Sequence, residues 1–366
     1  MTQSTAKLFL SWRNFVPVLA VVILGLAWGR ELAGGFVVVI GILLAGAVLA
    51  AVHHAEVVAH RVGEPYGSLV LAVAVTVIEV ALIVTLMIAG SGSAETLARD
   101  TVFAAVIITC NGIVGLSLLV GARRKSTVSF NAEGAGAALA TVATLSALGL
   151  VLPSFTTSTP GPQFSPPQLA FAAVTAFALY GLFVALQSGR HRDYFLPVSP
   201  SGAPLDPDEH ASPPTAREAW ISLALLLLAL VAVVGNAKLV SPTIERAVHV
   251  AGLPVSVVGV TIALLVLLPE TIAALRAAQR NRMQISLNLA FGSAMASIGL
   301  TIPTIAIASI WLPVPLHLGL DPMQIVLLAL TFLVAVLTVV PGRATLLQAG
   351  VHLALIAAYF FLAFVP

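Results

Sequence analysis

The sequence predicts an all-α membrane protein of about eleven transmembrane helices, arranged as one N-terminal helix and two inverted five-helix repeats. Three observations predict this fold class: the apolar composition, the spacing of the apolar runs, and a pattern that occurs twice. Apolar residues make up 59% of the 366 residues, and charged residues only 9%. Because a soluble domain carries about 25% charged residues, most of this surface must face lipid.

The net charge and the cysteine count say little more about the function. The net charge of +2 is too small to indicate nucleic-acid binding. The single cysteine, Cys110, has no second cysteine to pair with, so the redox compartment is not indicated.

The apolar runs have the lengths that membrane spans need. A spanning helix takes about 20 mostly apolar residues. The first run is expected to be a retained helix rather than a signal peptide, because no cleavage pattern follows it. Trp12 and Trp28 at its ends are candidate interface anchors. The predicted spans are 15–29, 36–60, 66–90, 101–121, 133–152, 169–187, 219–240, 254–275, 285–310, 322–340 and 345–365.

The distribution of positive charge predicts the orientation. Cytoplasmic loops carry the excess of Lys and Arg. With the N-terminus inside, 13 of the 17 Lys and Arg residues fall in inner segments. The remaining four are Arg30, Arg99, Lys238 and Arg246. We therefore expect a multi-pass protein of the bacterial inner membrane with a cytoplasmic N-terminus and an outer C-terminus.

The chain divides into four predicted parts. These are an N-terminal helix over 1–35, a first repeat half over 36–187, a cytoplasmic linker loop over 188–218, and a second repeat half over 219–366. The linker is polar and rich in proline, which indicates a flexible connection. Its acidic residues leave a regulatory cation site as the alternative.

Two segments share one design. Each is a long apolar run with one glutamate, Glu79 in the first and Glu270 in the second, and each is followed by a helix rich in small and hydroxyl residues. The two following helices contain Gly115-Leu116-Ser117 and Gly299-Leu300-Thr301. Because five spans is an odd number, the second copy enters the membrane in the opposite orientation. Inverted repeats with a binding site at the midplane are typical of secondary transporters.

The two glutamates explain why such a protein would exchange ions. A charge at the bilayer centre costs at least about 2.5–3.5 kcal/mol, so each carboxylate must be paired, protonated or bound to an ion. A divalent cation and protons would therefore compete for one site. Pro269 removes a backbone donor beside Glu270, which would free a carbonyl for the cation.

Other oxygen donors are needed because calcium takes six to eight oxygens and the two carboxylates supply at most about four. Serine and threonine in membrane helices are equally well explained as packing residues, so both interpretations stay open for them. Glu79 and Glu270 are the candidate metal ligands. The full set of candidate cation- and proton-binding residues is Glu79, Glu270, Thr76, Asn111, Thr109, Ser293, Ser297 and Pro269.

A second cluster lies at the cytoplasmic end of the second span. It consists of His53, His54, Glu56 and His60, and histidine titrates near neutrality, which makes it a candidate pH-sensing group. The alternative is a helix end in contact with water. A zinc-protease motif needs His-Glu-x-x-His, and Ala55 interrupts it here.

The two glutamate segments and their followers resemble the repeats of the calcium/cation antiporter superfamily, in the branch of cation/proton exchangers. The closest match is Gly63-Glu64-Pro65-Tyr66-Gly67 followed by the run to Glu79. The resemblance implies eleven helices, a midplane site formed by both repeats, and alternating access. Where many members have an asparagine in each repeat, this chain has Thr76 and Leu267, which leaves sodium or potassium as alternative cargoes.

The sequence thus predicts a cation/proton antiporter, not an enzyme, that exports calcium, with sodium or potassium as alternative cargoes. Its expected partners are inorganic cations, protons and the lipid bilayer, with no resident cofactor. A cation channel is the main alternative. A membrane-embedded enzyme is less favoured, because no nucleophile or metal motif is present.

Overall fold

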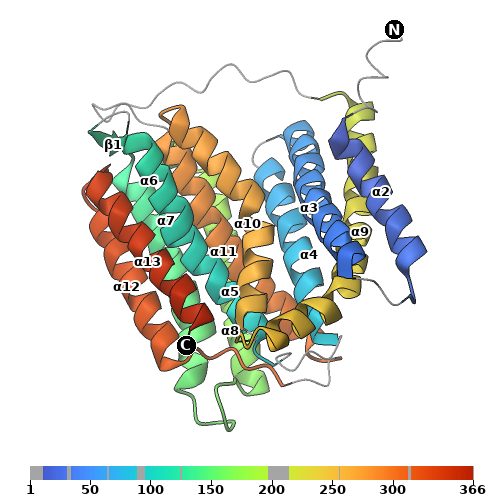
Figure 1. Ribbon diagram of the computed structural model, residues 1–366. Coiled ribbons are helices and arrows are strands. Elements are labelled where there is room, and N and C mark those ends of the chain that lie inside the picture. The colour runs from blue at the N-terminus through green and yellow to red at the C-terminus, as the bar shows by residue number, and fades with distance from the viewer. Residues whose placement is uncertain are drawn as a thin grey trace. The chain divides into compact units, whose positions relative to one another are not determined.

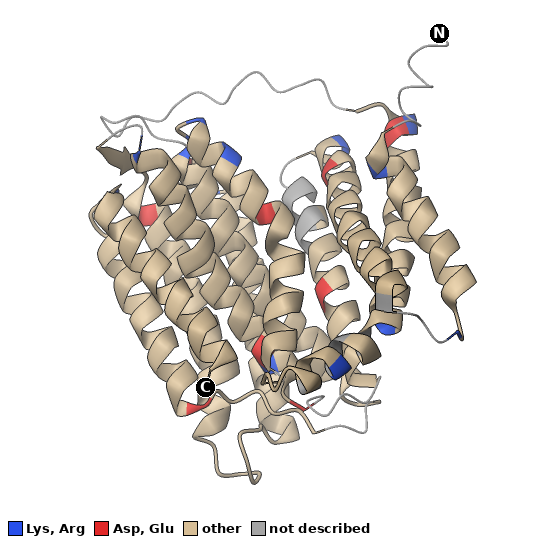
Figure 2. Ribbon diagram, in the orientation of Figure 1, with Lys and Arg blue, Asp and Glu red and all other residues tan. Residues whose placement is uncertain are grey.

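The computed structural model confirms the predicted fold class. It describes residues 11–30, 34–63, 66–88, 95–123, 126–196, 214–254, 256–311 and 315–365. Within them, nine helices are long and apolar enough to cross a membrane. Two shorter apolar segments are Trp12–Ala27 and Val73–Ile88, the second of which is part of a longer helix, Tyr66–Ile88. Figure 1 shows these helices, and Figure 2 shows that Lys and Arg gather at helix ends. The linker residues 197–213, Glu64 and Pro65 lie outside the described residues.

The helices form two compact units that cut across the sequence halves. Unit 1 comprises Met1–Ala94 and Ala211–Val258, and unit 2 comprises Glu95–His210 and Gly259–Pro366. Each unit therefore combines helices from both halves of the sequence. The division into sequence halves stays a prediction.

Unit 1 is built around α3 and α9, which pack along each other and against α2 and α4. Small residues allow the close approach, since Gly235 of α9 lies against Leu24 of α2 with no room for a Cβ atom. The helices of this unit are α2 (Trp12–Ala27), α3 (Gly34–Val62), α4 (Tyr66–Ile88) and α9 (Ala216–Val250).

Unit 2 holds the remaining elements. One span changes from α to π geometry and back, over Leu97–Ala122, and a second ends in π and 3-10 turns, over Ala132–Ser154. Its elements are α5 (Leu97–Ile107), η1 (Ile108–Ile113), α6 (Val114–Ala122), β1 (Thr127–Ser129), α7 (Ala132–Ser146), η2 (Ala147–Val151), η3 (Leu152–Ser154), α8 (Pro166–Ser188), η4 (Arg192–Phe195), α10 (Ser256–Gln279), α11 (Met283–Ala308), α12 (Pro322–Val339), β2 (Arg343–Thr345) and α13 (Leu346–Phe364).

The loops that the sequence assigns to the cytoplasmic side meet at one end of unit 2. Strand β1, after α6, pairs antiparallel with β2, after α12, with Val128 opposite Ala344. The backbone N–H of Asn131 donates to Gln284 Oε1 at 2.7 Å, which joins the start of α11 to the same end.

The loops assigned to the outer side meet at the other end of this unit. The N–H of His317 donates to the carbonyl of Glu95 at 3.0 Å, and the N–H of Gly319 donates to the carbonyl of Pro162 at 2.9 Å. An error in the number of preceding spans would have mixed the two groups of loops. The alternation of inner and outer loops that the predicted spans imply is therefore consistent with the structure of this unit.

The repeated Gly-Leu-Ser/Thr pattern has a packing reason in both copies. A Cβ atom added to Gly115 of α6 would lie 3.1 Å from the Cβ of His352 on α13. One added to Gly299 of α11 would lie 2.6 Å from the Cβ of Tyr180 on α8. Each glycine thus admits the last helix of the opposite half at close range, as small residues do in membrane helix contacts. The two contacts are the equivalent pair that a two-fold repeat predicts.

Candidate functional site

Glu79 lies midway along α4 in unit 1. Glu79 is only 4% exposed, and Thr76, three residues earlier, is 6% exposed, so both residues are buried within the unit. Residues three apart share a helix face, so the hydroxyl and the carboxylate lie on the same side of α4. The predicted association of Thr76 with Glu79 is thus compatible with the local geometry.

Glu270 lies in α10, which belongs almost entirely to unit 2. The helix continues from Ser256 to Gln279 through Pro269, and Glu270 is half-buried. Proline gives no N–H to the carbonyl four residues earlier, at Leu265. The next hydroxyl, of Thr271, donates to the carbonyl of Leu267 at 2.7 Å. The pairing of Glu270 with Glu79 stays a prediction, because the two residues belong to different units.

Four further candidates belong to unit 2. Thr109 and Asn111 lie in η1, which packs against α11, the helix that carries Ser293 and Ser297. Ser297 is 3% exposed and Ser293 is half-buried. The Thr109 hydroxyl donates to backbone carbonyls of its own helix, at 2.8 Å to that of Ala105. That contact is the packing arrangement expected of a threonine in a membrane helix.

Asn111 is at the centre of a buried polar network that the sequence did not reveal. Its Nδ2 donates to Thr331 Oγ1 at 2.8 Å, and its Oδ1 lies 3.1 Å from His352 Nδ1. The other ring nitrogen of His352 lies 3.0 Å from Thr338 Oγ1. Asn111 and His352 are fully buried, and Thr331 and Thr338 nearly so. Both polar atoms of the Asn111 amide therefore already have protein partners, and its direct ligation of a cation stays a prediction.

One sequence signal could have identified this network. His352 is an ionisable residue within the predicted span 345–365. An ionisable side chain inside a membrane span is expected to have a function or a buried partner. Its partners Asn111 and Thr331 come from other helices, so only the histidine itself could have been singled out.

A second missed feature is a buried carboxylate at the start of α5. Asp100 is 5% exposed and accepts from Arg99 Nε at 2.8 Å and from Thr96 Oγ1 at 3.0 Å. Arg99 also donates to the carbonyl of Gly319 at 3.2 Å. These contacts tie the beginning of α5 to the loop before α12. We interpret them as a structural anchor.

The histidine cluster lies in unit 1, near the end of α3. Arg13 of α2 lies 3.2 Å from His53 Nδ1, and the Arg13 carbonyl lies 3.2 Å from His54 Nε2. His53 Nδ1 is 3.9 Å from the carboxylate of Glu56, while Glu56 and His60 are exposed. The cluster thus joins α3 to α2 through Arg13. Its pH-sensing role stays a prediction.

No group of three or more His, Cys, Asp or Glu side chains that could hold a metal ion occurs within the described ranges. A cation bound at either glutamate would therefore take further oxygens from hydroxyls, amides, backbone carbonyls or water.

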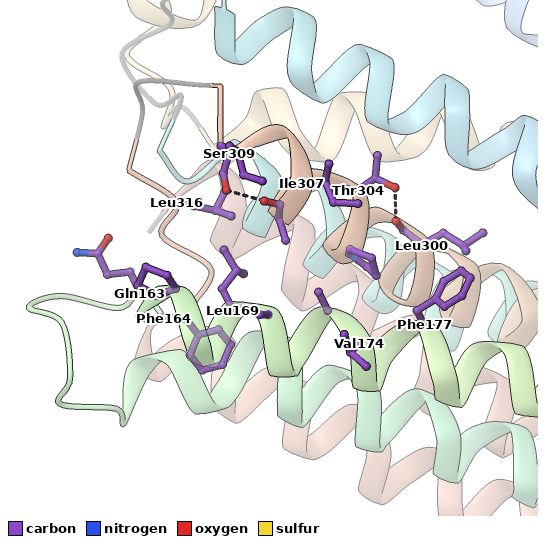
Figure 3. Close-up of a pocket in the computed structure, with 16 residues that line it drawn as sticks. Gln163, Phe164, Leu169, Val174, Phe177, Leu300, Thr304, Ile307, Ser309 and Leu316 are labelled. Carbon is purple, nitrogen blue, oxygen red and sulfur yellow. Dashed lines mark hydrogen bonds between the residues drawn. The ribbon is translucent and has the colours of Figure 1, made fainter.

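A pocket of about 900 Å³ between α8 and α11 is a different kind of feature (Figure 3). Its walls are mainly aliphatic and aromatic, with Leu169, Phe177 and Leu300 among them. The hydroxyls of Thr304 and Ser309 donate to carbonyls of their own helix, at 2.7 and 2.8 Å. Because its walls are mainly apolar and no predicted cation ligand lines it, this pocket is unsuited to a cation.

Comparison with known proteins places this arrangement in a family. The sodium/calcium exchanger protein family matches residues 32–189 and 221–365. A protein of Sinorhizobium fredii described as an ionic transporter, y4hA, is 46% identical over 362 residues, covering 97% of this chain and 96% of that protein. The sodium-potassium/proton antiporter ChaA of Escherichia coli is 34% identical over 347 residues, covering 94% and 93% of the two chains.

A solved structure shares the fold. The crystal structure of the H+/Ca2+ exchanger CAX superposes with a TM-score of 0.70 at 17% identity, covering 98% of this chain and 89% of that one. The resemblance expected from the two glutamate segments is thereby confirmed. The chain belongs to the sodium/calcium exchanger protein family, as a multi-pass membrane protein of its cation/proton antiporter branch.

Proposed function

We propose that this antiporter uses inward proton movement to export calcium, with sodium or potassium as alternative cargoes, and that Glu79 and Glu270 alternately bind the cation and protons. The observation that carries the proposal is the repetition of one carboxylate within the apolar part of matched helices. Glu79 lies buried in α4, and Glu270 lies in α10 directly after Pro269.

The electrostatics of these positions support exchange. An ionised carboxylate away from water is stabilised by a bound cation, and a protonated one needs no cation. The two loads therefore exclude each other at the same oxygens. Alternating access would then carry the cation in one direction and the protons in the other.

The choice of cargo is approached through the available oxygens. Calcium requires six to eight oxygen ligands. Asn111, the amide among the candidate ligands, already contacts Thr331 and His352. Because few amide ligands are available, we include the monovalent cations sodium and potassium, beside calcium, among the proposed cargoes. The names of the relatives point the same way, since one is a sodium-potassium/proton antiporter and the other a H+/Ca2+ exchanger.

We further propose that two ends face the cytoplasm of a bacterial inner membrane: in unit 2 the end that bears the β1–β2 pair, and in unit 1 the end where α3 stops and α9 begins. Support comes from Arg123 shortly before β1, from Arg343 in β2, and from Arg61, which donates to the carbonyl of Pro214 at 3.3 Å. A cytoplasmic excess of positive charge sets orientation in multi-pass proteins.

Everted membrane vesicles test the proposal. Glu79→Gln and Glu270→Gln should each abolish proton release on addition of calcium, sodium or potassium, while the protein still inserts. Glu133→Gln is the matched control, because Glu133 is an exposed carboxylate in the first turn of α7. It should exchange like the unaltered protein.

Exchange at the unaltered rate in either glutamine variant would refute the assigned roles of the glutamates. A cation channel would differ both from an exchanger and from an inactive variant. It would dissipate the pH gradient without a fixed ratio of protons to cations.

A further inference from the structure

The hydrogen bonds around His352 indicate which of its ring nitrogens carries the hydrogen in the neutral ring. The Thr331 hydroxyl donates to the carbonyl of Leu327 at 2.8 Å, so its oxygen is left to accept from Asn111 Nδ2. This directs Asn111 Oδ1 toward His352. Since that oxygen can only accept, His352 Nδ1 carries the hydrogen, and Nε2 of the neutral ring is left to accept from the hydroxyl of Thr338. A neutral imidazole in one tautomer satisfies every contact.

The histidine acts on an unusual stretch of backbone. Asn111 lies in η1, a π-helical segment between two α-helical ones. Such segments shift the hydrogen bonds from the fourth to the fifth residue and are frequent at functional sites. One side chain of α13 thus contacts a side chain in the middle of η1.

Packing alone does not require this network. In the other repeat, Gly299 makes the close contact that Gly115 makes here, and its partner is Tyr180. Four residues before Gly299, in the place corresponding to Asn111, lies the fully buried Met295. Helix α11 is α-helical throughout Met283–Ala308. The polar network and the π segment therefore occur together in one repeat and are absent together at the equivalent place in the other.

We propose that His352 is a positioning residue: in its neutral form it holds η1 in π-helical register and so sets the direction in which Thr109 and the α5 face before it point. An α-helix turns by about 100° per residue. The π segment η1 contains one residue more per hydrogen-bonded turn than an α-helix. If η1 became α-helical, α5 would therefore rotate relative to α6 by about that angle. The consequence for transport rests on the proposed antiport function, whereas the consequence for the helix does not.

Cys110 supplies a reporter that does not depend on transport. It is the single cysteine of the chain, lies within η1 and is fully buried. A thiol reagent reacts only when the thiol is accessible. The rate at which N-ethylmaleimide labels Cys110 in the detergent-solubilised full-length protein therefore measures the register of η1, and mass spectrometry reads the product directly.

Two substitutions separate the contacts of the ring. His352→Asn places an amide at the position of Nδ1 and keeps the bond to Asn111, so its labelling should match that of the unaltered protein. His352→Gln reaches toward Thr338 and gives up the bond to Asn111. We expect it to label at least about tenfold faster, because about 1.4 kcal/mol of hydrogen bonding is lost. Tyr180→Phe is the control at the equivalent contact and should leave labelling unchanged.

Transport by the same variants completes the test. In everted vesicles, His352→Gln should raise the cation KM by about tenfold with a smaller change in the maximal rate, and His352→Asn should restore the KM. Equal labelling of the glutamine and asparagine variants would overturn the proposal, even if transport were lost in both. If labelling separates the variants and none of the proteins exchanges cations for protons, the proposed function fails and the positioning role stands.

Discussion

Thr76 and Glu79 lie one turn apart on α4, and both are buried. If the Thr76 hydroxyl completes the cation's oxygen shell, Thr76→Val should raise the cation KM by about five- to tenfold, because one polar contact contributes about 1–1.5 kcal/mol. Proton release at saturating cation should change less. Initial rates in everted vesicles over a range of cation concentrations measure both quantities.

The control for this substitution is Thr141→Val. Thr141 is partly exposed on α7, and its hydroxyl donates to its own helix at the carbonyl of Ala137. It should transport normally. An unchanged KM in Thr76→Val would remove Thr76 from the proposed site.

Individual residues differ in how well the sequence predicts them. Glu79 and Glu270 were identifiable because a carboxylate within an apolar run is costly and therefore needs a reason. Asn111 was named among the candidate cation ligands, a role that stays a prediction, and its hydrogen-bond partners could not be named from the sequence. His352 is 241 residues away from it in the chain, so no local pattern connects the two.

The contact of α11 with α8 makes a prediction for whole helices. In Gly299→Ala, the added Cβ would lie 2.6 Å from the Cβ of Tyr180, so the helices must separate. Overpacking of this kind costs about 1–3 kcal/mol, and the apparent melting temperature in detergent should fall.

Gly292→Ala on the same helix is the matched control. A Cβ atom there meets nothing within 4 Å, and alanine favours a helix over glycine by about 0.5–1 kcal/mol. This variant should melt at the same temperature or higher. Equal destabilisation by the two substitutions would show that the close contact is not what matters.

Helices were predictable because hydropathy and length determine them, and their internal irregularities were not. The predicted span 219–240 is continued by α9 to Val250, with Pro242 inside the helix. Hydropathy marks where apolar residues stop, whereas a helix can continue into polar sequence. The π segments η1 and η2 change hydrogen-bond partners without changing composition, so no periodicity reveals them.

At the scale of the molecule, the predicted linker provides a test of how the halves assemble. Cutting the chain between Leu205 and Asp206 interrupts none of the described helices. Co-expression of residues 1–205 with 206–366 should restore cation/proton exchange, because unit 2 draws α5 to α8 from one fragment and α11 to α13 from the other.

Each fragment alone should be inactive for the same reason. A cut inside α7, between Thr144 and Leu145, serves as the control and should not be rescued by co-expression. Exchange by a single fragment would contradict the mixed composition of unit 2.

The bond between Asn111 and His352 also has a consequence for the making of the protein. The two residues are 241 positions apart, and chains grow at about 5–20 residues per second. After Asn111 is synthesised, roughly 10 to 50 seconds therefore pass before its partner exists. During that interval Asn111 lacks the histidine partner that it has in the finished protein, and a buried polar group without partners is costly. The first half can therefore reach its final packing only after α13 has been made.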